Sequence, residues 1–170
     1  QQALALARAN LDEARRSVLD LRAAPPEGRS LAAALAGLAS EATAQTGGQT
    51  PVTLAAVGSS RPLPVSVEVG LYRVAQEALA NALRHAHARH VQITLTATPA
   101  FVRLLIEDDG QGFDLDETPP ERYGLVGMNE RMGLLGGSLH VRSARGMGTQ
   151  IEATVPLAAP PPLPPTQPPT

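Results

Sequence analysis

The sequence Gln76-Glu77-Ala78-Leu79-Ala80-Asn81-Ala82-Leu83-Arg84-His85-Ala86 spaces Glu77, Asn81 and His85 one helical turn apart, with Arg84 beside them. Apolar residues recur at helical spacing across 66–87, which predicts a helix with one buried and one polar face. A solvated polar face is the simplest interpretation. However, asparagine in mid-helix lowers helix propensity. Its oxygen can bind Mg²⁺ and its amide can donate to phosphate, while Glu77 can orient or deprotonate a nucleophile near that metal.

Three glycine-containing motifs follow this helix. The first, Glu107-Asp108-Asp109-Gly110-Gln111-Gly112-Phe113, comes directly after an apolar strand. A carboxylate there can accept a hydrogen bond from an exocyclic amine such as that of adenine. Its glycines let the backbone approach a ring or a phosphate closely. An Asp/Gly-rich turn without any ligand would look the same.

The second motif, Gly124-Leu125-Val126-Gly127-Met128-Asn129-Glu130-Arg131, enters a helix that we expect between about residues 125 and 135. A helix N-terminus offers free N–H groups and a dipole that favours anions. The third, Gly146-Met147-Gly148-Thr149, suits a tight turn before a strand, with the hydroxyl toward a ligand. A plain loop-to-helix turn and a hairpin are the alternatives. The sequence contains no Gly-x-x-x-x-Gly-Lys-Ser/Thr phosphate loop.

Around these motifs we predict a helix over 31–46, capped by Ser30 and ended by Gly47-Gly48. Strands are expected at 52–57, 91–95, 101–106, 138–143 and 149–155. The later strands lack regular intervening helices. The fold class is therefore α/β (α+β): a two-layer sandwich with a mixed, mostly antiparallel sheet, covered on one face by helices.

The two ends of the chain differ from this domain, which we place at 31–157. Residues 1–24 carry apolar residues in a heptad-like seam from Leu4 to Leu21, which predicts a coiled-coil-like helix that packs on other helices. An amphipathic helix packed on its own domain is the alternative. Residues 25–30 are the expected linker. Residues 158–170 form a proline-rich tail that we expect to be disordered, rather than a ligand for a proline-recognising domain.

Composition excludes several classes of protein. The chain has 170 residues, a net charge of −2, no cysteine and few aromatic residues. A disulfide framework and thiolate metal sites are therefore excluded, and nucleic acid is not an expected partner. No apolar run is long enough for a membrane span. Since Gln1 lies inside the predicted helix, we expect a cytoplasmic fragment of a longer protein, and whether that protein is membrane-anchored stays open.

In this order, the motifs resemble those of the Bergerat-fold (GHKL) ATPases, the group of gyrase, Hsp90, MutL and histidine kinases. The Glu77…Asn81 helix resembles the N box, and Asp108-x-Gly110-x-Gly112, Gly124-x-x-Gly127 and Gly146-x-Gly148-Thr149 resemble the glycine boxes. Residues 76–86 and 124–131 are similar to sensor histidine kinases of the NarL/DesK-type subfamily. Residues 13–22 resemble the end of that subfamily's second dimerisation helix. The resemblance covers about residues 1–157.

The resemblance implies an ATP-binding catalytic domain that transfers the γ-phosphoryl group to a histidine. Glu77 would assist proton transfer, Asn81 would hold Mg²⁺, and Asp108 would bind the adenine amine, with Thr149 near the adenine. Arg84 and His85 would lie near the phosphates. The other implied nucleotide-binding residues are Gly110, Gly112, Gly124, Gly127, Met128, Gly146 and Gly148. A cognate response regulator and a homodimer of the full-length protein are the implied partners.

The acceptor histidine of the subfamily lies on the first dimerisation helix, which is absent from this sequence. The four histidines here are His85, His87, His90 and His140, and none has the expected acceptor context. We therefore expect a fragment without its phosphoacceptor. An anti-sigma-factor-type serine kinase of the same fold and a non-catalytic nucleotide-binding or dimerisation module are the alternatives.

Overall fold

The computed structural model describes residues 29–58, 62–115 and 122–157. The predicted helix over 1–24, most of the linker and the proline-rich tail lie outside these ranges. The described elements, in chain order, are α2 (Leu31–Gln45), β1 (Val52–Gly58), α3 (Val65–His85), β2 (Val91–Ala97), β3 (Phe101–Asp108), α4 (Arg122–Leu134), β4 (Ser138–Ser143) and β5 (Thr149–Pro156). Each predicted strand and helix of the domain is present.

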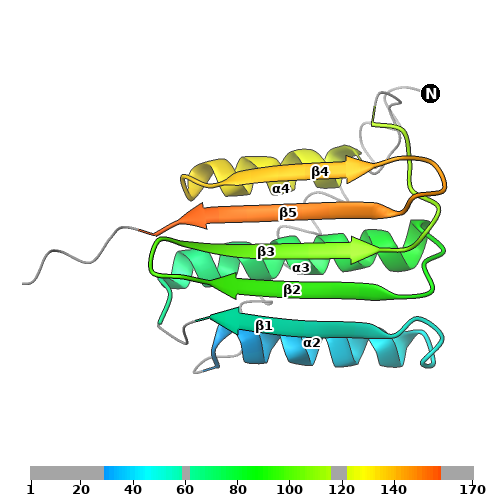
Figure 1. Ribbon diagram of the computed structural model, residues 1–170, viewed down its shortest axis with the longest axis horizontal. Helices are drawn as coiled ribbons and strands as arrows, with labels where there is room; N and C mark the ends of the chain where they lie inside the picture. The colour runs from blue at the N-terminus through cyan, green and yellow to red at the C-terminus, as the bar shows by residue number, and fades with distance from the viewer. Residues whose placement is uncertain (1–28, 59–61, 116–121, 158–170) are drawn as a thin grey trace, which may run out of the picture.

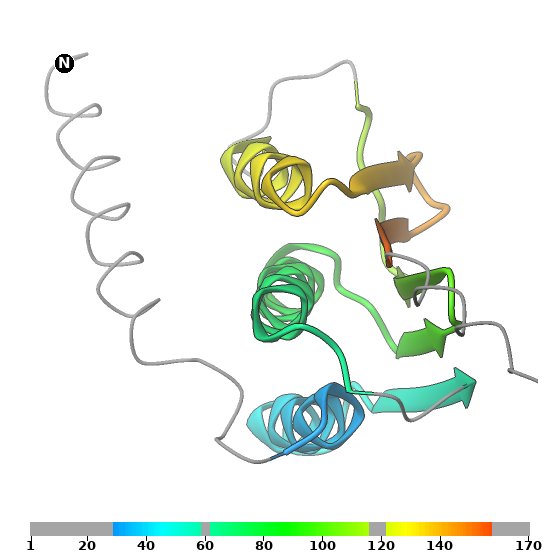
Figure 2. The ribbon, with the colours of Figure 1, turned by 90° about the vertical axis from the view of Figure 1, so that its left-hand side faces the viewer.

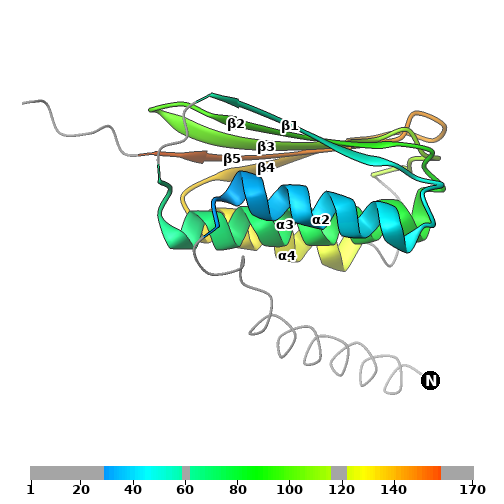
Figure 3. The ribbon, with the colours of Figure 1, turned by 90° about the horizontal axis from the view of Figure 1, so that it is seen from below.

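The five described strands form one sheet in the order β1-β2-β3-β5-β4 (Figure 1). β1 pairs with β2 in parallel, and the other three pairings are antiparallel. All three described helices cover the same face of the sheet, and no described helix lies on the other face (Figures 2 and 3). The expected two-layer sandwich with a mixed, mostly antiparallel sheet is confirmed.

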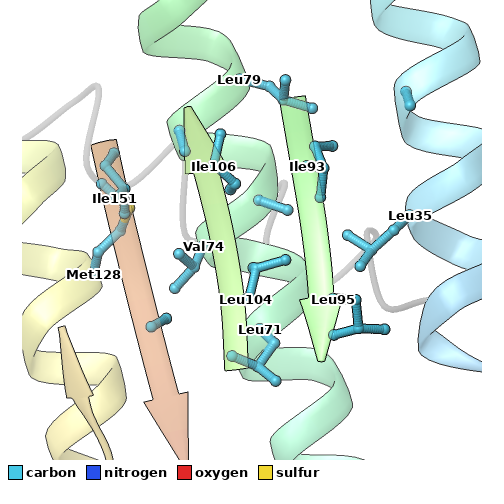
Figure 4. Close-up of a cluster of buried hydrophobic side chains, with 14 of the residues drawn as sticks. Leu35, Leu71, Val74, Leu79, Ile93, Leu95, Leu104, Ile106, Met128 and Ile151 are labelled. Atoms are coloured by element: carbon cyan, nitrogen blue, oxygen red, sulfur yellow. The ribbon is translucent and has the colours of Figure 1, made fainter. Parts of the chain in front are cut away.

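The hydrophobic core lies between the sheet and the helices (Figure 4). Alternate residues of β2 and β3 point into it, because successive side chains of a strand face opposite sides. Ile93 and Leu104 are fully buried there, as are Leu71 and Val74 of α3 and Leu35 of α2. Helix α3 lies behind the central strands, and its C-terminal half carries the polar residues Glu77, Asn81 and His85.

Helix α2 begins and ends as its sequence predicts. The Ser30 hydroxyl accepts a hydrogen bond from the Ala33 N–H at 3.3 Å, and Gly47 and Gly48 follow the helix with positive φ. A threonine then ties the helix to the sheet. The Thr43 hydroxyl oxygen accepts a hydrogen bond from the Val52 N–H, the first residue of β1, at 2.9 Å.

Helix α4 begins at Arg122, about three residues before the predicted start. Gly124 therefore lies in its first turn and Gly127 in its second, so these glycines are part of the helix. Glycine lowers helix propensity, and α4 contains three in 13 residues. The buried side chains of Met128 and Met132 hold the helix against the core. Among the described residues, no helix is long and apolar enough to cross a membrane.

Candidate functional site

A pocket of about 210 Å³ opens between α3, the start of α4 and the paired ends of β3 and β5. Its apolar walls come from three small residues of α3 and its C-terminal end, from α4 and from β5. These residues are Ala78, Ala82, Ala86, Leu125 and Ile151, with Phe113 from the loop after β3. The volume is below the ~300–1,000 Å³ of pockets that enclose drug-sized ligands, so it suits a flat heterocycle better than a whole nucleotide.

The carboxylate of Asp108 lines this apolar pocket at the end of β3. Burial raises the pKa of the Asp108 carboxyl above its ordinary value, and hydrogen bonds from Gly110 and Thr149 offset part of that rise. The Gly110 N–H donates to Asp108 Oδ1 at 2.9 Å. This is a half-buried carboxylate held in one orientation, with capacity left to accept a further hydrogen bond.

Thr149, the first residue of β5, lies directly opposite Asp108 in the antiparallel pairing of β3 with β5. It lines the pocket, and its hydroxyl is 3.1 Å from the Ser143 hydroxyl. Ser143 in turn accepts a hydrogen bond from the Phe113 N–H at 2.9 Å. Thr149 therefore lies beside the carboxylate, and Ser143 connects it to the loop after β3.

The glycines after Asp108 act mainly through protein packing. A Cβ atom on Gly110 would collide with the carbonyl of Ala86, and one on Gly112 with the carbonyl of Ala144. Likewise, a Cβ atom on Gly148 would collide with the carbonyl of Asp108. The sequence predicts that these glycines admit a ligand. In the structure Gly112 does line the pocket, but all three are needed for close approach of the chain to itself.

Gln111 joins three segments around the pocket. Its amide Nε2 donates to the His85 carbonyl at 2.6 Å, and its backbone N–H donates to the Ala86 carbonyl at 2.7 Å. Its own carbonyl accepts from the Gly146 N–H at 2.6 Å. Since carbonyls at a helix C-terminus lack intrahelical partners, Gln111 caps α3 while it holds the turn between β4 and β5.

Helix α3 presents Asn81 and His85 to the same pocket. Within the described chain, the Asn81 side chain forms no hydrogen bond, so its oxygen and its amide are available to a ligand. Glu77, one turn earlier, lies against Gly124, where any Cβ atom would touch its carboxylate. The N-terminal turn of α4 is thereby placed beside the polar face of α3. The first N–H groups of any helix have no partner within the helix itself.

A divalent cation fits this arrangement only together with a second ligand. Asn81 supplies one neutral oxygen, and Mg²⁺ completes its octahedron with waters and phosphate oxygens in sites of this kind. In the described ranges, no group of three or more His, Cys, Asp or Glu side chains lies together as a metal site. The donor set therefore fits a metal that arrives with a phosphate chain.

Asp109, next to Asp108, binds the backbone of the loop between α3 and β2. Its Oδ1 accepts hydrogen bonds from the backbone N–H groups of Arg89 and His90, at 2.7 and 2.9 Å. These bonds hold the pKa of the Asp109 carboxyl below its ordinary value, and the bond from His90 is the main cause. Asp109 thus fixes the loop between α3 and β2 and does not line the pocket.

The remaining predicted site residues lie around the pocket, outside its lining. Arg84 is exposed at the end of α3, and Gly127 is exposed on α4. Met128 is buried in the core, where Figure 4 shows it beside Ile151. Gly146, with φ of 77°, lies in the turn held by Gln111. The loop between residues 116 and 121 is outside the described ranges.

Residues 66–159, more than half of the chain, match the family described as "Histidine kinase-, DNA gyrase B-, and HSP90-like ATPase". The chain belongs to this family. It is therefore a histidine kinase-like ATPase domain, and the pocket with its half-buried aspartate lies inside the matched region.

The relatives of this ATPase domain are sensor kinases. It is 44% identical over 94 residues to the signal transduction histidine-protein kinase/phosphatase DegS of Bacillus subtilis, which covers 54% of this chain and 24% of DegS. It is 35% identical over 146 residues to the sensor histidine kinase LiaS of Bacillus subtilis, over 86% of this chain and 39% of LiaS. The chain thus spans well under half the length of these curated relatives.

A solved structure supports the same assignment. The histidine kinase domain of the blue-light activated histidine kinase EL346 from Erythrobacter litoralis superposes with a TM-score of 0.60 at 25% identity. The match covers 80% of this chain and 65% of that one. The predicted membership of the histidine kinase group of GHKL ATPases is confirmed.

Sequence reasoning missed the apolar lining of the ATPase pocket. Ala78 and Ala82 were expected only as core residues of α3, and Ile151 only as part of a strand. A usable signal was present for Ile151, since it lies two residues after Thr149 and therefore on the same face of β5. No sequence motif singles out Gln111, and its capping role depends on contacts distant in sequence.

Proposed function

We propose that this domain binds ATP with Mg²⁺ and transfers the γ-phosphoryl group to a histidine of a dimerisation domain in the full-length protein. One observation carries the proposal: a carboxylate in an apolar, base-sized pocket shares that pocket with an asparagine whose side chain has no hydrogen-bond partner among the described residues. The first group suits an adenine, and the second suits a metal-bound phosphate.

At the base end, the ionised carboxylate of Asp108 accepts a hydrogen bond from the exocyclic amine of adenine. Guanine carries a carbonyl at that position, so two acceptors would face each other and guanine would be disfavoured. The apolar walls, including Ile151 and Leu125, exclude water from the ring faces. Thr149 keeps the carboxylate in place through its own hydrogen bonds.

At the phosphate end, Asn81 contributes its oxygen to the metal. The N–H groups of the first turn of α4, which have no partner within the helix, stabilise phosphate charge. Mg²⁺, when bound, neutralises charge that develops on the β- and γ-phosphates. His85 lines the pocket and Arg84 precedes it at the end of α3, and we propose that both contribute hydrogen-bond donors to the phosphates.

The nucleophile comes from outside this chain. His85 is fixed at the end of α3 beside the pocket, and a group held as a contact cannot swing into line with the γ-phosphate. An acceptor histidine on a separate, moving helix meets the geometric requirement. Glu77, on the polar face of α3, orients or deprotonates that incoming imidazole. We propose that a response regulator then receives the phosphoryl group, and that the full-length protein is a homodimer.

The domain would act in the cytoplasm, where ATP is available, whether or not the full-length protein carries a membrane anchor. A net charge of −2 offers no general attraction for nucleic acid. DegS is named as a kinase and phosphatase, and we extend only the kinase activity to this chain.

The test supplies the chain with labelled ATP, Mg²⁺ and a helical hairpin that contains the acceptor histidine of a relative. Acid-labile phosphate should appear on the hairpin and not on the chain. Asn81→Asp should abolish the transfer, since a carboxylate in place of the amide repels the phosphates. Gln92→Glu, an amide-to-carboxylate change on a strand away from the pocket, is the matched control and should leave transfer unchanged.

Stable label on His85, His87, His90 or His140 of the chain itself would overturn the assignment of the acceptor. Phosphorylation of a serine substrate instead of the hairpin would favour a serine kinase of the same fold. Mg²⁺-dependent ATP binding without transfer to any acceptor would leave a nucleotide-binding module, and the kinase proposal would be wrong.

A further inference from the structure

Ser143, the last residue of β4, joins the edge of the pocket to the loop that follows β3. The end of β4, the start of β5 and the end of β3 lie side by side at one end of the sheet (Figure 1). Ser143 lies directly opposite Thr149, and Thr149 lies directly opposite Asp108. Because residues directly opposite each other point to the same face of a sheet, these side chains form one polar row across three strands.

The Ser143 hydroxyl bonds to three neighbours. It accepts a hydrogen bond from the Phe113 N–H at 2.9 Å and donates to the Gly148 carbonyl at 3.0 Å. Its oxygen also lies 3.1 Å from the Thr149 hydroxyl oxygen. Phe113 and Thr149 line the pocket, whereas Ser143 lies outside that lining. Any influence of Ser143 on a bound base therefore passes through these neighbours.

The number of protons fixes the direction of this hydrogen-bond chain. An ionised carboxylate only accepts, so the Thr149 hydroxyl uses its single proton for its bond to Asp108. In the contact between the two hydroxyls, Thr149 therefore accepts and Ser143 donates. The Ser143 proton is shared with the Gly148 carbonyl, as in a three-centre hydrogen bond. Donation thus runs from the Phe113 N–H through Ser143 and Thr149 to Asp108.

We propose that Ser143 is a positioning residue for recognition of the adenine: it directs the Thr149 hydroxyl onto the Asp108 carboxylate, which accepts from the base. This inference rests on the proposed function of the pocket. A hydroxyl that accepts a hydrogen bond becomes a stronger donor, because the bonds of a chain polarise one another. Ser143 thus strengthens the hold of Thr149 on the carboxylate without touching the base itself.

A purely structural role for Ser143 predicts a different result. Its bonds to Gly148 and Phe113 also hold the turn between β4 and β5 and the loop after β3. If only these bonds mattered, loss of the hydroxyl would lower stability and leave the ionisation of Asp108 unchanged. Burial raises the pKa of the Asp108 carboxyl, and the hydrogen bond from the Thr149 side chain lowers it. A weaker bond from Thr149 therefore raises that pKa further.

The charged and titratable groups around Asp108 stay the same when Ser143 is replaced. Asp109 follows it in the chain and raises its pKa by repulsion. His85 of α3 lines the same pocket, and Glu107 and Arg142 line a second groove together with Asp108. Since serine carries no charge, a changed titration of Asp108 would report a changed hydrogen bond.

The first test follows Asp108 in the whole chain without nucleotide. In Ser143→Ala, the NMR signal of the Asp108 carboxyl carbon should titrate at a higher pH than in the parent. Ser143→Thr keeps a hydroxyl on the same Cβ atom and should titrate like the parent. Ser138→Ala, at the exposed start of the same strand, is the matched control and should leave the titration unchanged.

The second test measures the affinity for ADP as a function of pH. Ser143→Ala should bind roughly three- to tenfold more weakly at neutral pH, the size of one net hydrogen bond. Its affinity should also begin to fall at a higher pH than that of the parent, and Ser143→Thr should restore both properties. Ser143→Cys, with a weak S–H donor, should lie between the two and serves if the alanine variant does not fold.

A double substitution separates the two routes from Ser143 to the pocket. Thr149→Val removes the hydroxyl that links Ser143 to Asp108. In this background, Ser143→Ala should cause no further shift in the titration of Asp108, because the two residues act in one chain.

The same titration of Asp108 in folded Ser143→Ala and in the parent would overturn the inference and leave Ser143 a structural role. A shift that persists in the Thr149→Val background would place the effect in the loop that carries Phe113, which also contradicts it. A parent chain that does not bind ADP at all would contradict the proposed function instead. The titration of the free protein would still decide whether Ser143 directs Thr149.

Discussion

Asp108 and Thr149 lie directly opposite each other where β3 pairs with β5, and Thr149 hydrogen-bonds to the Asp108 carboxylate through both its backbone and its side chain. The carboxylate is therefore held by its cross-strand neighbour while it faces the apolar pocket. Under the proposed function, recognition of the base therefore depends on the ionisation of this one side chain.

Asp108→Asn should weaken binding of ATP and ADP by about tenfold or more, since a hydrogen bond to a charged group contributes ~1.5–3 kcal/mol. The neutral amide keeps the shape of the side chain but loses the charge. Isothermal titration calorimetry measures the effect. Asp109→Asn is the matched control and should bind normally, because Asp109 lies outside the pocket. Equal affinities for Asp108→Asn and the parent would refute the assignment.

The same affinity should fall as the pH drops. Burial raises the pKa of Asp108, and only the ionised carboxylate accepts from the adenine amine. Binding is thus strongest above that raised pKa and weakens as the pH falls through it. Comparison with Asp108→Asn removes the contribution of protonation of the nucleotide itself. Parallel pH profiles for the two proteins would contradict the prediction.

Asp109→Ala should lower the free energy of unfolding at neutral pH by about 1 kcal/mol. This loss is smaller than for a buried carboxylate, because the Asp109 side chain is exposed. The folded-state pKa of Asp109 is depressed, so its contribution is present above the ordinary carboxyl pKa of ~3.9 and disappears as the pH falls through the lower folded value. Urea denaturation at pH 7 and near pH 2 checks this. A difference of the same size at both pH values would speak against it.

Gln111→Met should loosen the end of α3 while keeping the volume of the side chain. The variant leaves the His85 carbonyl without the Nε2 donor, so we expect a loss of about 1 kcal/mol in stability and a severalfold weaker affinity for ATP. Gln45→Met, at an exposed position at the end of α2, is the control. Thermal melts and nucleotide titration measure both effects. An unchanged ATP affinity would mean that the cap does not position the pocket.

Two glycine-to-alanine substitutions should change the stability of the domain in opposite directions. Gly148→Ala should destabilise the domain by more than about 2 kcal/mol, because φ is 72° there and the new methyl group meets the Asp108 carbonyl. Gly127→Ala should stabilise it by about 0.5–1 kcal/mol, since nothing lies within 4 Å and alanine favours a helix. Chemical denaturation measures the change in unfolding free energy of both variants. A change in the same direction for both would contradict either the helical position of Gly127 or the tight turn at Gly148.

The order of elements and the polar half of the site were predictable because each rests on local pattern. Ser30 and Gly47 bound a helix by caps, and Asp108 follows an apolar strand. The start of α4 was not predictable in this way. Gly124 favours a loop in sequence, yet α4 begins two residues before it, and Met128 and Met132 hold the helix in the core.

The sequence also did not show why Gly110 and Gly148 must be glycines. Gly110 and Ala86, or Gly148 and Asp108, approach each other only after the chain has folded, so a local pattern cannot distinguish a glycine that admits a ligand from one that admits another segment. The order of the strands in the sheet also depends on contacts distant in sequence, although a strand-helix-strand order such as β1-α3-β2 is the usual route to a parallel pair.

Ile151, Ala78, Ala82 and Ala86 are at most 8% exposed and also form the wall of the pocket. The hydrophobic core of this domain therefore has a gap in its side, which by the proposed function a purine ring fills. A bound nucleotide would then complete the packing of the core. The melting temperature of the domain should consequently report nucleotide occupancy directly, rising with ligand concentration as binding is linked to folding.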